Sequence, residues 1–328
     1  MNRVAAPVRL DFAGGWTDVP PFVSREGGVV VNATIDRWVE AGFEPGCDGI
    51  LVVAEDLQQS IRARGPAALA RAGPLELHRA ALRMFPPGAG TLRTRSAVPP
   101  GSGLGSSGAL DVALVAVLAA ARQEPLTPED LAHHGWQLET VEARFPGGRQ
   151  DQYAAALGGF HRLALTDAAT LPQPLPLDPA FLAELGRRTL VCYTGRSRVS
   201  GDTVARVMAA YERQDQVVTG ALRELVEVAE RMTEALLAAD LATVGRLLSK
   251  NWDCQQRLDG GMRTPEMAAL EAAVVEARPL GGKAAGAGAG RCMLFLIGGD
   301  LETARQAAAR VGTRVLGANF VSRGVHPC

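Results

Sequence analysis

Apolar and polar residues alternate one by one near the start of the chain. Residues 8–12 (VRLDF) place three apolar side chains on one face of an extended segment and Arg9 and Asp11 on the other, which is the period of a half-buried β-strand. The apolar, β-branched run 28–35 predicts a second strand. We expect residues 37–43 to form its hairpin partner.

Other apolar residues recur with the period of a helix. Within 219–239, leucine, valine, alanine and methionine return every three or four positions, as on a helix that packs one face against a core. Strands and helices alternate along the chain, and together with the hairpins they predict an α+β fold. We expect further strands at 50–61, 91–98, 189–193, 292–297 and 314–320, and further helices at 67–84, 127–144, 200–214, 241–250, 264–277 and 301–311.

The composition favours a globular enzyme over a nucleic-acid-binding or membrane protein. The chain has 328 residues, 47% of them hydrophobic, which suits one large or two ordinary domains. Its formal net charge is -1 and it has no long block of like charge, so neither nucleic acid nor a membrane is expected as a partner. The first residues lack the apolar core of a signal peptide, and five scattered cysteines fit neither a disulfide framework nor a zinc site. We therefore expect a cytoplasmic location.

A stretch rich in glycine and serine, residues 99–108 (PPGSGLGSSG), separates the strand predicted at 91–98 from an apolar run that predicts a buried helix. Glycines permit positive φ and let amide N–H groups approach a ligand closely. A helix that begins at Ser106 or Ser107 adds unpaired N–H donors and the positive end of its dipole. The combination predicts an anion cradle suited to the phosphates of a nucleotide. Taken alone, a flexible surface loop before a core helix would explain the same residues.

Two aspartates stand where a glycine turn meets a regular element. Asp18 ends the turn at 13–18 (AGGWTD), where it either binds a ligand or caps the next segment. Asp151 follows two glycines and falls in the first turn of an expected helix. There the helix dipole and a nearby Arg9 favour its ionised form, which can accept a proton from a hydroxyl group.

Further polar residues lie on the predicted helices. Glu139 and Glu142 occupy neighbouring turns of one helix and can supply a carboxylate to Mg²⁺, although a solvated helix face explains them as well. His133 and His134 are adjacent, so they point about 100° apart on a helix and cannot share a metal ion. We interpret His78 as a surface residue, because no partner lies at metal-ligand spacing.

Three stretches occur in the order of the three motifs of the GHMP kinases, the family of galactokinase, homoserine kinase, mevalonate kinase and phosphomevalonate kinase. They are RLDFAGGWTD at 9–18, the glycine-rich stretch at 99–108, and GAGAG at 286–290, which by itself would also fit a mobile linker. Residues 14–18 (GGWTD) and 147–153 (GGRQDQY) resemble the branch that holds D-glycero-D-manno-heptose 7-phosphate kinases and L-fucokinases. Galactokinases usually carry glutamate at the second position of GGWTD, which disfavours galactose as the substrate.

The resemblance implies a set of site residues. Asp151 is implied to be the catalytic base, with Arg9 beside it. Mg²⁺ is implied to bind Ser107 (or Ser106) and Glu139, whose spacing from Asp151 fits the family better than that of Glu142. The residues implied to contact the sugar are Asp18, Gly15, Trp16 and Thr17. Arg198, or Arg196 in its place, can contact a substrate phosphate, although a solvated basic turn explains these arginines as well. Those implied to hold ATP are Pro100, Gly101, Ser102, Gly103, Leu104, Gly105, Ser106, Ser107, Gly108, Gly286 and Gly288.

The chain departs from the family pattern in the third motif. Relatives usually have glycine where this chain carries Ala289 and Arg291. A Cβ atom at 289 would hinder a positive-φ conformation there, so the detailed roles of this loop are not carried over from the family.

The resemblance also implies the fold and the reaction. The expected fold has two lobes, an ATP-binding N-terminal domain (1–170) like ribosomal protein S5 and a ferredoxin-like C-terminal domain (180–328), with the active site between them. The expected activity is that of an ATP-dependent sugar kinase that converts heptose 7-phosphate to the 1,7-bisphosphate, with L-fucose as the alternative sugar. A catalytically silent sensor of nucleotide and sugar, or an unrelated scaffold, would be a different class of protein. A homodimer is left open.

Overall fold

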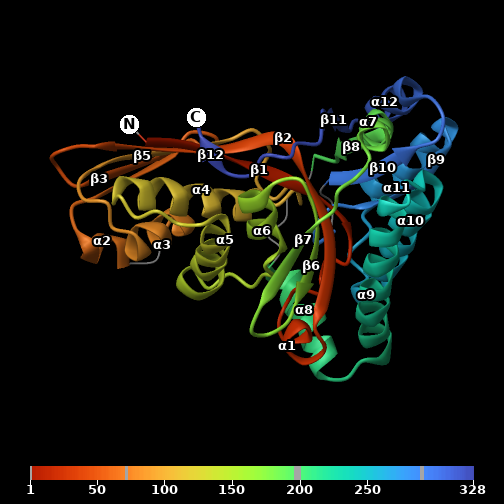
Figure 1. The fold of residues 1–328 in the computed structure, drawn as a ribbon, viewed down its shortest axis with the longest axis horizontal. Helices are drawn as coiled ribbons and strands as arrows, with labels where there is room; N and C mark the ends of the chain where they lie inside the picture. Colours follow the sequence, from red (N-terminus) through yellow and green to blue (C-terminus); the bar gives the residue numbers. More distant parts are fainter. Residues whose placement is uncertain (1, 71–72, 196–200, 289–291) are drawn as a thin grey trace.

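The computed structural model describes residues 2–70, 73–195, 201–288 and 292–328, and their strands form an eight-stranded and a four-stranded sheet (Figure 1). The larger sheet has the order β12-β1-β2-β5-β3-β4, and β6 pairs with both β2 and β7. Its strands are β1 (Asn2–Ala13), β2 (Gly28–Pro45), β3 (Ile50–Ala54), β4 (Gln59–Ala63), β5 (Gly90–Ser96), β6 (Phe160–Leu165), β7 (Thr170–Pro174) and β12 (His326–Pro327). The mixture of sheets and helices agrees with the predicted α+β class.

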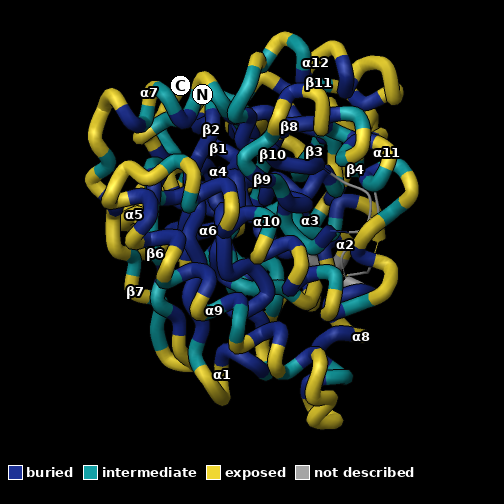
Figure 2. Tube along the Cα trace, turned by 90° about the vertical axis from the view of Figure 1, so that its right-hand side faces the viewer, coloured by how far each residue is buried: buried dark blue, intermediate teal, exposed yellow. Residues whose placement is uncertain are grey.

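The helices on the larger sheet centre on α4 (Ser106–Ala121). Most side chains of α4 are apolar and buried, and the helix packs against β1, β2 and its helical neighbours, as expected for a helix with apolar residues on all its faces. Figure 2 shows this region as the buried interior of the molecule. The other helices of this part are α1 (Phe22–Glu26), α2 (Pro66–Ala70), α3 (Glu76–Met84), α5 (Pro128–Gln137), the π-helix η1 (Leu138–Glu142) and α6 (Gln150–Leu157).

The smaller sheet has the order β11-β8-β10-β9. The long helices α9 and α10 pack against each other, α10 also lies on β9, and both contact β1, so they join the two sheets. The strands are β8 (Thr189–Tyr193), β9 (Pro279–Ala284), β10 (Cys292–Ile297) and β11 (Arg314–Leu316). The helices are α7 (Pro179–Arg188), α8 (Gly201–Glu212), α9 (Gln216–Leu237), α10 (Leu241–Leu258), α11 (Pro265–Val274), the short 3₁₀ helix η2 (Val275–Ala277) and α12 (Leu301–Arg310).

The predicted hairpin between 28–35 and 37–43 is wrong, because both segments belong to the single strand β2. The pairing with β1 shifts register between Pro7 and Val8. Two residues of β2 therefore have no partner on β1 at this point and form a bulge. The backbone N–H of Asp36 donates to the carbonyl of Asn319 instead. A bulge and a turn use the same polar residues, and local sequence does not separate them.

Two helix predictions also need correction. The helix predicted at 67–84 is two helices, α2 and α3, and α10 continues to Leu258 instead of ending at 250. His78 on α3 is not a surface residue: it is buried, and its Nε2 atom lies 2.8 Å from Thr94 Oγ1 on β5. Burial lowers its pKa to about 4, so it is neutral near pH 7.

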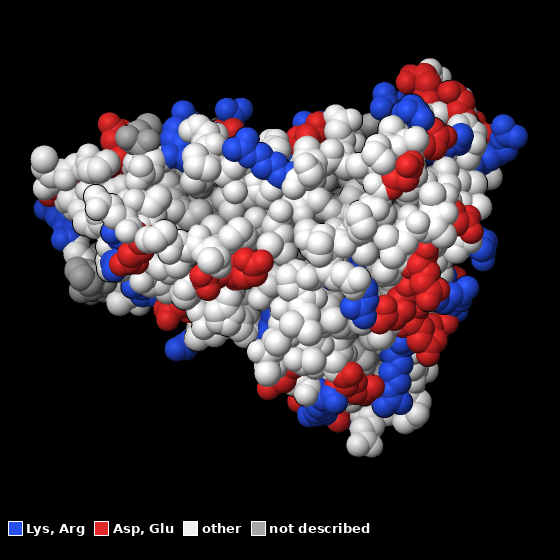
Figure 3. Space-filling model, in the orientation of Figure 1, with Lys and Arg blue, Asp and Glu red and all other residues white. Residues whose placement is uncertain are grey.

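The two ends of the chain lie beside each other on the larger sheet (Figure 1), because β12 pairs with β1 at Val4 and Pro327. Acidic and basic side chains gather over α9, α10 and α12 on the face drawn in Figure 3, and much of its centre is uncharged. In the described part of the chain, no helix combines the length and the apolar character needed to cross a bilayer.

A buried ion pair connects the two sheets. Lys283 on β9 and Asp11 on β1 are both inaccessible to solvent, and the Lys283 Nζ atom lies 2.8 Å from Asp11 Oδ2 and donates to the Asp11 backbone carbonyl, also at 2.8 Å. The alternation at 8–12 predicts a solvent-facing side for Asp11, but the smaller sheet and its helices cover that side. Charges buried in this way are tolerated only when they are paired.

We expect the substitution Lys283→Met to lower the free energy of unfolding in urea by about 3–5 kcal/mol, because it leaves the Asp11 carboxylate buried and unpaired. The double variant Lys283→Met/Asp11→Leu should recover most of this loss, because no charge of this pair is then left in the interior.

The control is Lys250→Met, at the chain's only other lysine, which is half-exposed and forms an ion pair with Glu224. That control should cost less than about 1 kcal/mol. An equal loss in the two single variants would contradict the role given to the buried pair.

Candidate active site

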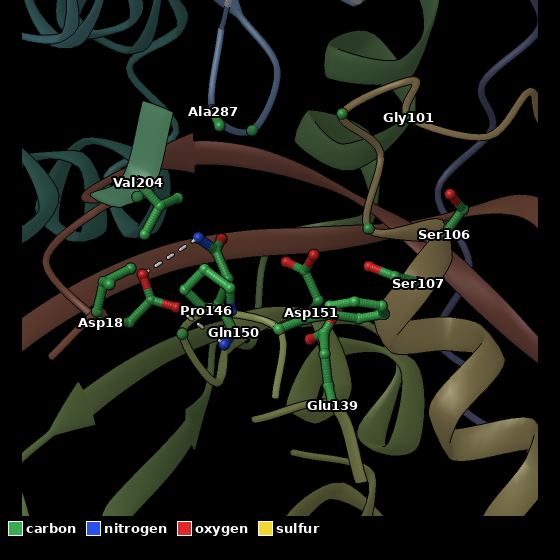
Figure 4. A pocket seen from close by; sticks show the side chains of 18 of the residues that line it. Asp18, Gly101, Ser106, Ser107, Glu139, Pro146, Gln150, Asp151, Val204 and Ala287 are labelled. Atoms are coloured by element: carbon green, nitrogen blue, oxygen red, sulfur yellow. Dashed lines mark hydrogen bonds between the residues drawn. The ribbon is translucent and has the colours of Figure 1, made fainter. Parts of the chain in front are cut away.

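A cavity of about 650 Å³ brings together stretches of sequence that lie far apart in the chain (Figure 4). Its walls come from the end of β1 and the turn after it, the loop before α4, the segment from η1 to α6, α8, and the loop after β9. Predicted site residues that line it are Arg9, Gly15, Trp16, Asp18, Pro100, Gly101, Gly103, Gly105, Ser106, Ser107, Glu139, Asp151 and Gly286.

The loop before α4 has the backbone that an anion cradle requires. Gly101, Gly103 and Gly105 have φ values of 66°, 81° and 74°, a region that side chains other than glycine rarely adopt. The first turn of α4 follows directly and begins at Ser106. The N-terminal N–H groups of the helix therefore point toward the cavity, and their dipoles favour a negatively charged ligand there.

The side chain of Arg9 connects this loop to Asp151. Its Nε donates to Asp151 Oδ1 at 2.9 Å, a second guanidinium nitrogen lies 2.6 Å from the same oxygen, and the third donates to the carbonyl of Gly103 at 2.6 Å. Arg9 is only 4% exposed, whereas 23% of the Asp151 side chain remains open. The carboxylate of Asp151 is therefore held in place on one side and accessible from the cavity on the other.

Gly108 allows this approach of α6 to α4. A Cβ atom at position 108 would lie 2.4 Å from the Cβ of Asp151, which is closer than two such atoms can come. Glycine at 108 thus lets the start of α6 reach the start of α4, and Figure 4 shows Asp151 beside Ser107 as a result.

Asp18 is held at the other end of the cavity by the start of α6. The backbone N–H groups of Arg149 and Gln150 donate to its Oδ2 at 3.0 and 3.1 Å, and the Gln150 side chain approaches Oδ1 at 3.5 Å. Burial raises the pKa of Asp18 to about 6, and the nearby charge of Asp151 adds to the rise, while the hydrogen bond from Gln150 opposes it.

Glu139 lies on the π-helix η1, in a second acidic part of the cavity. Gln152 Nε2 donates to Glu139 Oε2 at 2.7 Å and lies 3.3 Å from Asp111 Oδ2. Burial raises the pKa of Glu139 to about 7, helped by the charge of Asp151 and opposed by hydrogen bonds from Gln152 and Ser107. Burial raises the pKa of Asp111 as well, with Glu139 as a second cause. A cation would relieve this concentration of carboxylates.

The donor set fits Mg²⁺ better than a transition metal. The described residues hold no group of three or more His, Cys, Asp or Glu side chains around one point. Mg²⁺ is usually bound by one or two carboxylates together with phosphate oxygens and water. Glu139 and the hydroxyl of Ser107 form a contact in the cavity and match that preference.

Other predicted residues lie behind the cavity wall or outside the described residues. Thr17 donates its hydroxyl to the carbonyl of Gly14 at 2.7 Å and so closes the turn that carries Asp18. Ser102 and Leu104 are fully buried, and the carbonyl of Leu104 accepts from the Arg9 N–H at 2.9 Å. Gly288 contacts Met262. Arg196, Arg198, Ala289 and Arg291 lie outside the described residues.

Sequence reasoning missed the amides that connect the acidic side chains. Gln150 and Gln152 flank Asp151, and their alternation with it along the first turn of α6 was the available signal. Asp111 is a single charge inside the apolar helix α4 and could have been noticed on that ground. Asn251 lies on α10 in a segment that resembles the same kinase branch, but its local sequence does not indicate that it accepts from the Gly14 N–H, 237 residues away in the chain.

Comparison with known proteins supports the resemblance seen in the sequence. Residues 72–159 match the model of the GHMP kinases N terminal domain. D-glycero-alpha-D-manno-heptose 7-phosphate kinase of Campylobacter jejuni is 28% identical over 303 residues, which cover 90% of this chain and 89% of that protein. The L-fucokinase/L-fucose-1-P guanylyltransferase of Bacteroides fragilis is 29% identical over 334 residues, but the match spans only 35% of that longer protein.

A solved structure shows the same fold. The structure of a D-glycero-D-manno-heptose 1-phosphate kinase from Bacteroides thetaiotaomicron superposes with a TM-score of 0.81 over 100% of this chain and 99% of that one, at 23% identity. At this level of identity the comparison establishes the arrangement of the two sheets and their helices, in agreement with the predicted fold.

The raised pKa of Glu139 predicts a pH-dependent stability difference in the ligand-free protein. Between its unfolded pKa near 4.5 and its folded pKa of about 7, the unfolded state releases the proton first, so this group lowers stability progressively as pH rises. The difference in melting temperature, Glu139→Gln minus wild type, should therefore increase by about 2–4 °C or more between pH 5 and pH 8. The control Glu142→Gln, at an exposed position on the same helix, should not show this trend. A pH-independent difference for Glu139→Gln would contradict the assignment.

Proposed function

The chain belongs to the GHMP kinase family, and from that membership we propose that it transfers the γ-phosphate of ATP to the anomeric hydroxyl of a sugar, D-glycero-D-manno-heptose 7-phosphate. The observation that carries this proposal is the convergence in one cavity of Asp151, the glycine loop before α4 and the Asp18 turn. The similarity to the heptose 7-phosphate kinase over nine-tenths of the chain supports the choice of sugar.

In this proposal the nucleotide lies along the loop before α4. The triphosphate occupies the cradle formed by residues 100–108 and the first turn of α4, with Gly286 opposite. The adenine ring of the nucleotide occupies a second cavity of about 190 Å³. This cavity shares Pro100, Gly101 and Ser106 with the first and extends toward His78 and Thr94. The two cavities together offer adjoining polar and apolar spaces, as a nucleotide requires.

Asp151 is the proposed general base. Its carboxylate accepts the proton of the sugar hydroxyl as the hydroxyl oxygen attacks the γ-phosphorus, a contribution of roughly 10²–10⁴ in rate. Arg9 holds the carboxylate in the direction of the cavity, and Asp18 with the rest of its turn (Gly15, Trp16 and Thr17) orients the sugar. Most of the remaining rate enhancement comes from positioning and from neutralising phosphate charge.

Ser107 and Glu139 are the proposed ligands of Mg²⁺. When bound, the ion neutralises phosphate charge during transfer. Loss of the Glu139 proton is then favoured, because the cation stabilises the carboxylate form that burial disfavours.

We propose that residues 1–170 and 180–328 act as the two domains on either side of this site. The two sheets support the division, although β12 returns to the first sheet at the end of the chain. L-fucose is the second candidate substrate, because the fucokinase of B. fragilis matches 91% of this chain.

The variant Asp151→Asn tests the proposed base. It should lose about 10²–10⁴-fold in turnover, measured as ADP release with heptose 7-phosphate, while the affinity for ATP stays within about threefold. Because Glu142 is exposed and forms an ion pair with Arg83, the control Glu142→Gln should keep its turnover. If Asp151→Asn turns over within threefold of wild type, Asp151 is not the base; if the wild type binds ATP and releases no ADP with any sugar, the protein is a sensor.

Arg198 tests the choice of sugar. A charge-assisted hydrogen bond to the 7-phosphate predicts that Arg198→Ala raises KM for heptose 7-phosphate by roughly 10-fold or more and leaves turnover of L-fucose unchanged. Arg187→Ala, at an exposed arginine of α7 that is paired with Glu184, is the matched control. Equal turnover of both sugars by wild type and Arg198→Ala would remove the case for this arginine.

A further inference from the structure

Two buried amide side chains on α10 connect opposite walls of the cavity. Asn251 and Gln255 are one helical turn apart, and neither is accessible to solvent. Asn251 Oδ1 accepts from the N–H of Gly14 at 2.9 Å, and its Nδ2 donates to Gln255 Oε1 at 3.2 Å. Gln255 Nε2 donates in turn to the carbonyl of Gly286 at 2.9 Å. We refer to Asn251 and Gln255 as the α10 amide relay.

One end of the relay holds the turn that carries Asp18. The carbonyl of Gly14 accepts from both the N–H of Thr17, at 3.1 Å, and its hydroxyl, at 2.7 Å. Gly14 has a φ of 82°, and a Cβ atom there would lie 1.9 Å from the carbonyl oxygen of Val29. The backbone of Gly14 therefore holds the turn together through its carbonyl, and its N–H is the group that donates to the relay on α10.

The other end holds the loop that faces the phosphate cradle. Gly286 packs so closely on Gly103 that a Cβ atom at 286 would lie 2.7 Å from the Gly103 carbonyl oxygen. That same oxygen accepts from Arg9, and the N–H of Cys292 donates to the carbonyl of Ser102 at 2.9 Å. A ligand that orders the cradle therefore also orders Gly286.

The relay and Arg9 complete a ring of contacts around the cavity. From Gly14 the ring passes through Asn251 and Gln255 to Gly286, then across the packing contact to Gly103, and through Arg9 back to β1. Each relay amide is buried, so breaking one bond leaves an unsatisfied polar group in a site of low dielectric and is costly. The ring therefore favours one relative placement of the Asp18 turn and the cradle.

We propose that Asn251 and Gln255 are positioning residues that couple the two halves of the site, so that a nucleotide seated on the cradle orders the Asp18 turn for the sugar. The proposal rests on the proposed function, since it takes the cradle as the nucleotide site and the turn as the sugar site. Coupling of this kind typically changes the affinity of the second ligand by about 5- to 150-fold.

Amide hydrogen exchange tests the coupling without any sugar. In the full-length wild type, a non-hydrolysable ATP analogue with Mg²⁺ should slow exchange in peptides covering 101–108 and also in the peptide covering 12–18. In Gln255→Met, the analogue should still protect 101–108, but protection of 12–18 should fall by at least fivefold. Gln255→Glu, which keeps the acceptor oxygen for Asn251 but carries no amide donor for Gly286, should behave in the same way.

The matched control is the neighbouring Gln256, which points about 100° away from Gln255 on the helix and donates to the carbonyl of Trp252 at 3.4 Å. Gln256→Met should show the wild-type protection of both peptides. If protection of 12–18 is the same in Gln255→Met as in wild type, or is missing in wild type while 101–108 is protected, the relay does not couple the two halves. Absence of protection at 101–108 in wild type would instead remove the proposed nucleotide site.

Kinetics provide a second readout that loss of stability alone would not change. With the sugar that wild type phosphorylates and with saturating ATP, Gln255→Met should raise KM for the sugar by about 5-fold or more, because the coupling acts on the affinity of the second ligand. The Kd of ATP measured without sugar should change by less than about threefold, since the groups that bind ATP remain in place. The double variant Asn251→Ala/Gln255→Met should raise KM for the sugar no further than the worse single variant, because both substitutions break one relay. Additive increases would contradict a shared path.

Discussion

The guanidinium group of Arg9 is the contact on which the site depends. It extends from β1 into the wall of the cavity, almost without exposure, and its N–H groups donate to a carboxylate from α6 and a carbonyl from the loop before α4. A buried guanidinium without such partners would be strongly unfavourable, so the strand, the loop and the helix must meet in this arrangement. Arg9 thereby fixes Asp151 beside the cradle, although 142 residues of chain separate the two.

The site gathers negative charge before any ligand binds. Asp18, Glu139, Asp111 and Asp151 lie close enough that the charges of neighbours contribute to the raised pKa values of the first three. The raised pKa values of these carboxyl groups disfavour their charged forms in the empty protein, and a cation bound as proposed would favour them. The Arg9 side chain and the positive end of the α4 dipole lie next to Asp151, at the edge of the cradle where phosphate oxygens are proposed to bind. Positive and negative groups of the protein therefore meet at Asp151, beside the cradle.

Local sequence signals predicted the parts of the site that local geometry forms. The glycines at 101, 103 and 105 need positive φ, and the first turns of α4 and α6 begin where their preceding glycines end, so the cradle and Asp151 could be placed without a structure. Bonds between distant residues left no such signal. The pairs Asp11–Lys283 and Gly14–Asn251 join segments more than 200 residues apart, and the sequence around one partner does not indicate the other. The bulge in β2 and the burial of His78 likewise follow from packing against later segments.

The most direct test of this account is a crystal structure with a non-hydrolysable ATP analogue, Mg²⁺ and heptose 7-phosphate bound together. We expect the γ-phosphate to contact backbone N–H groups between residues 103 and 107, with one carboxylate oxygen of Asp151 within hydrogen-bond distance of the anomeric hydroxyl and Asp18 on other hydroxyls of the sugar. A triphosphate bound outside the cradle, or a sugar whose hydroxyls lie beyond the reach of Asp151, would contradict the account.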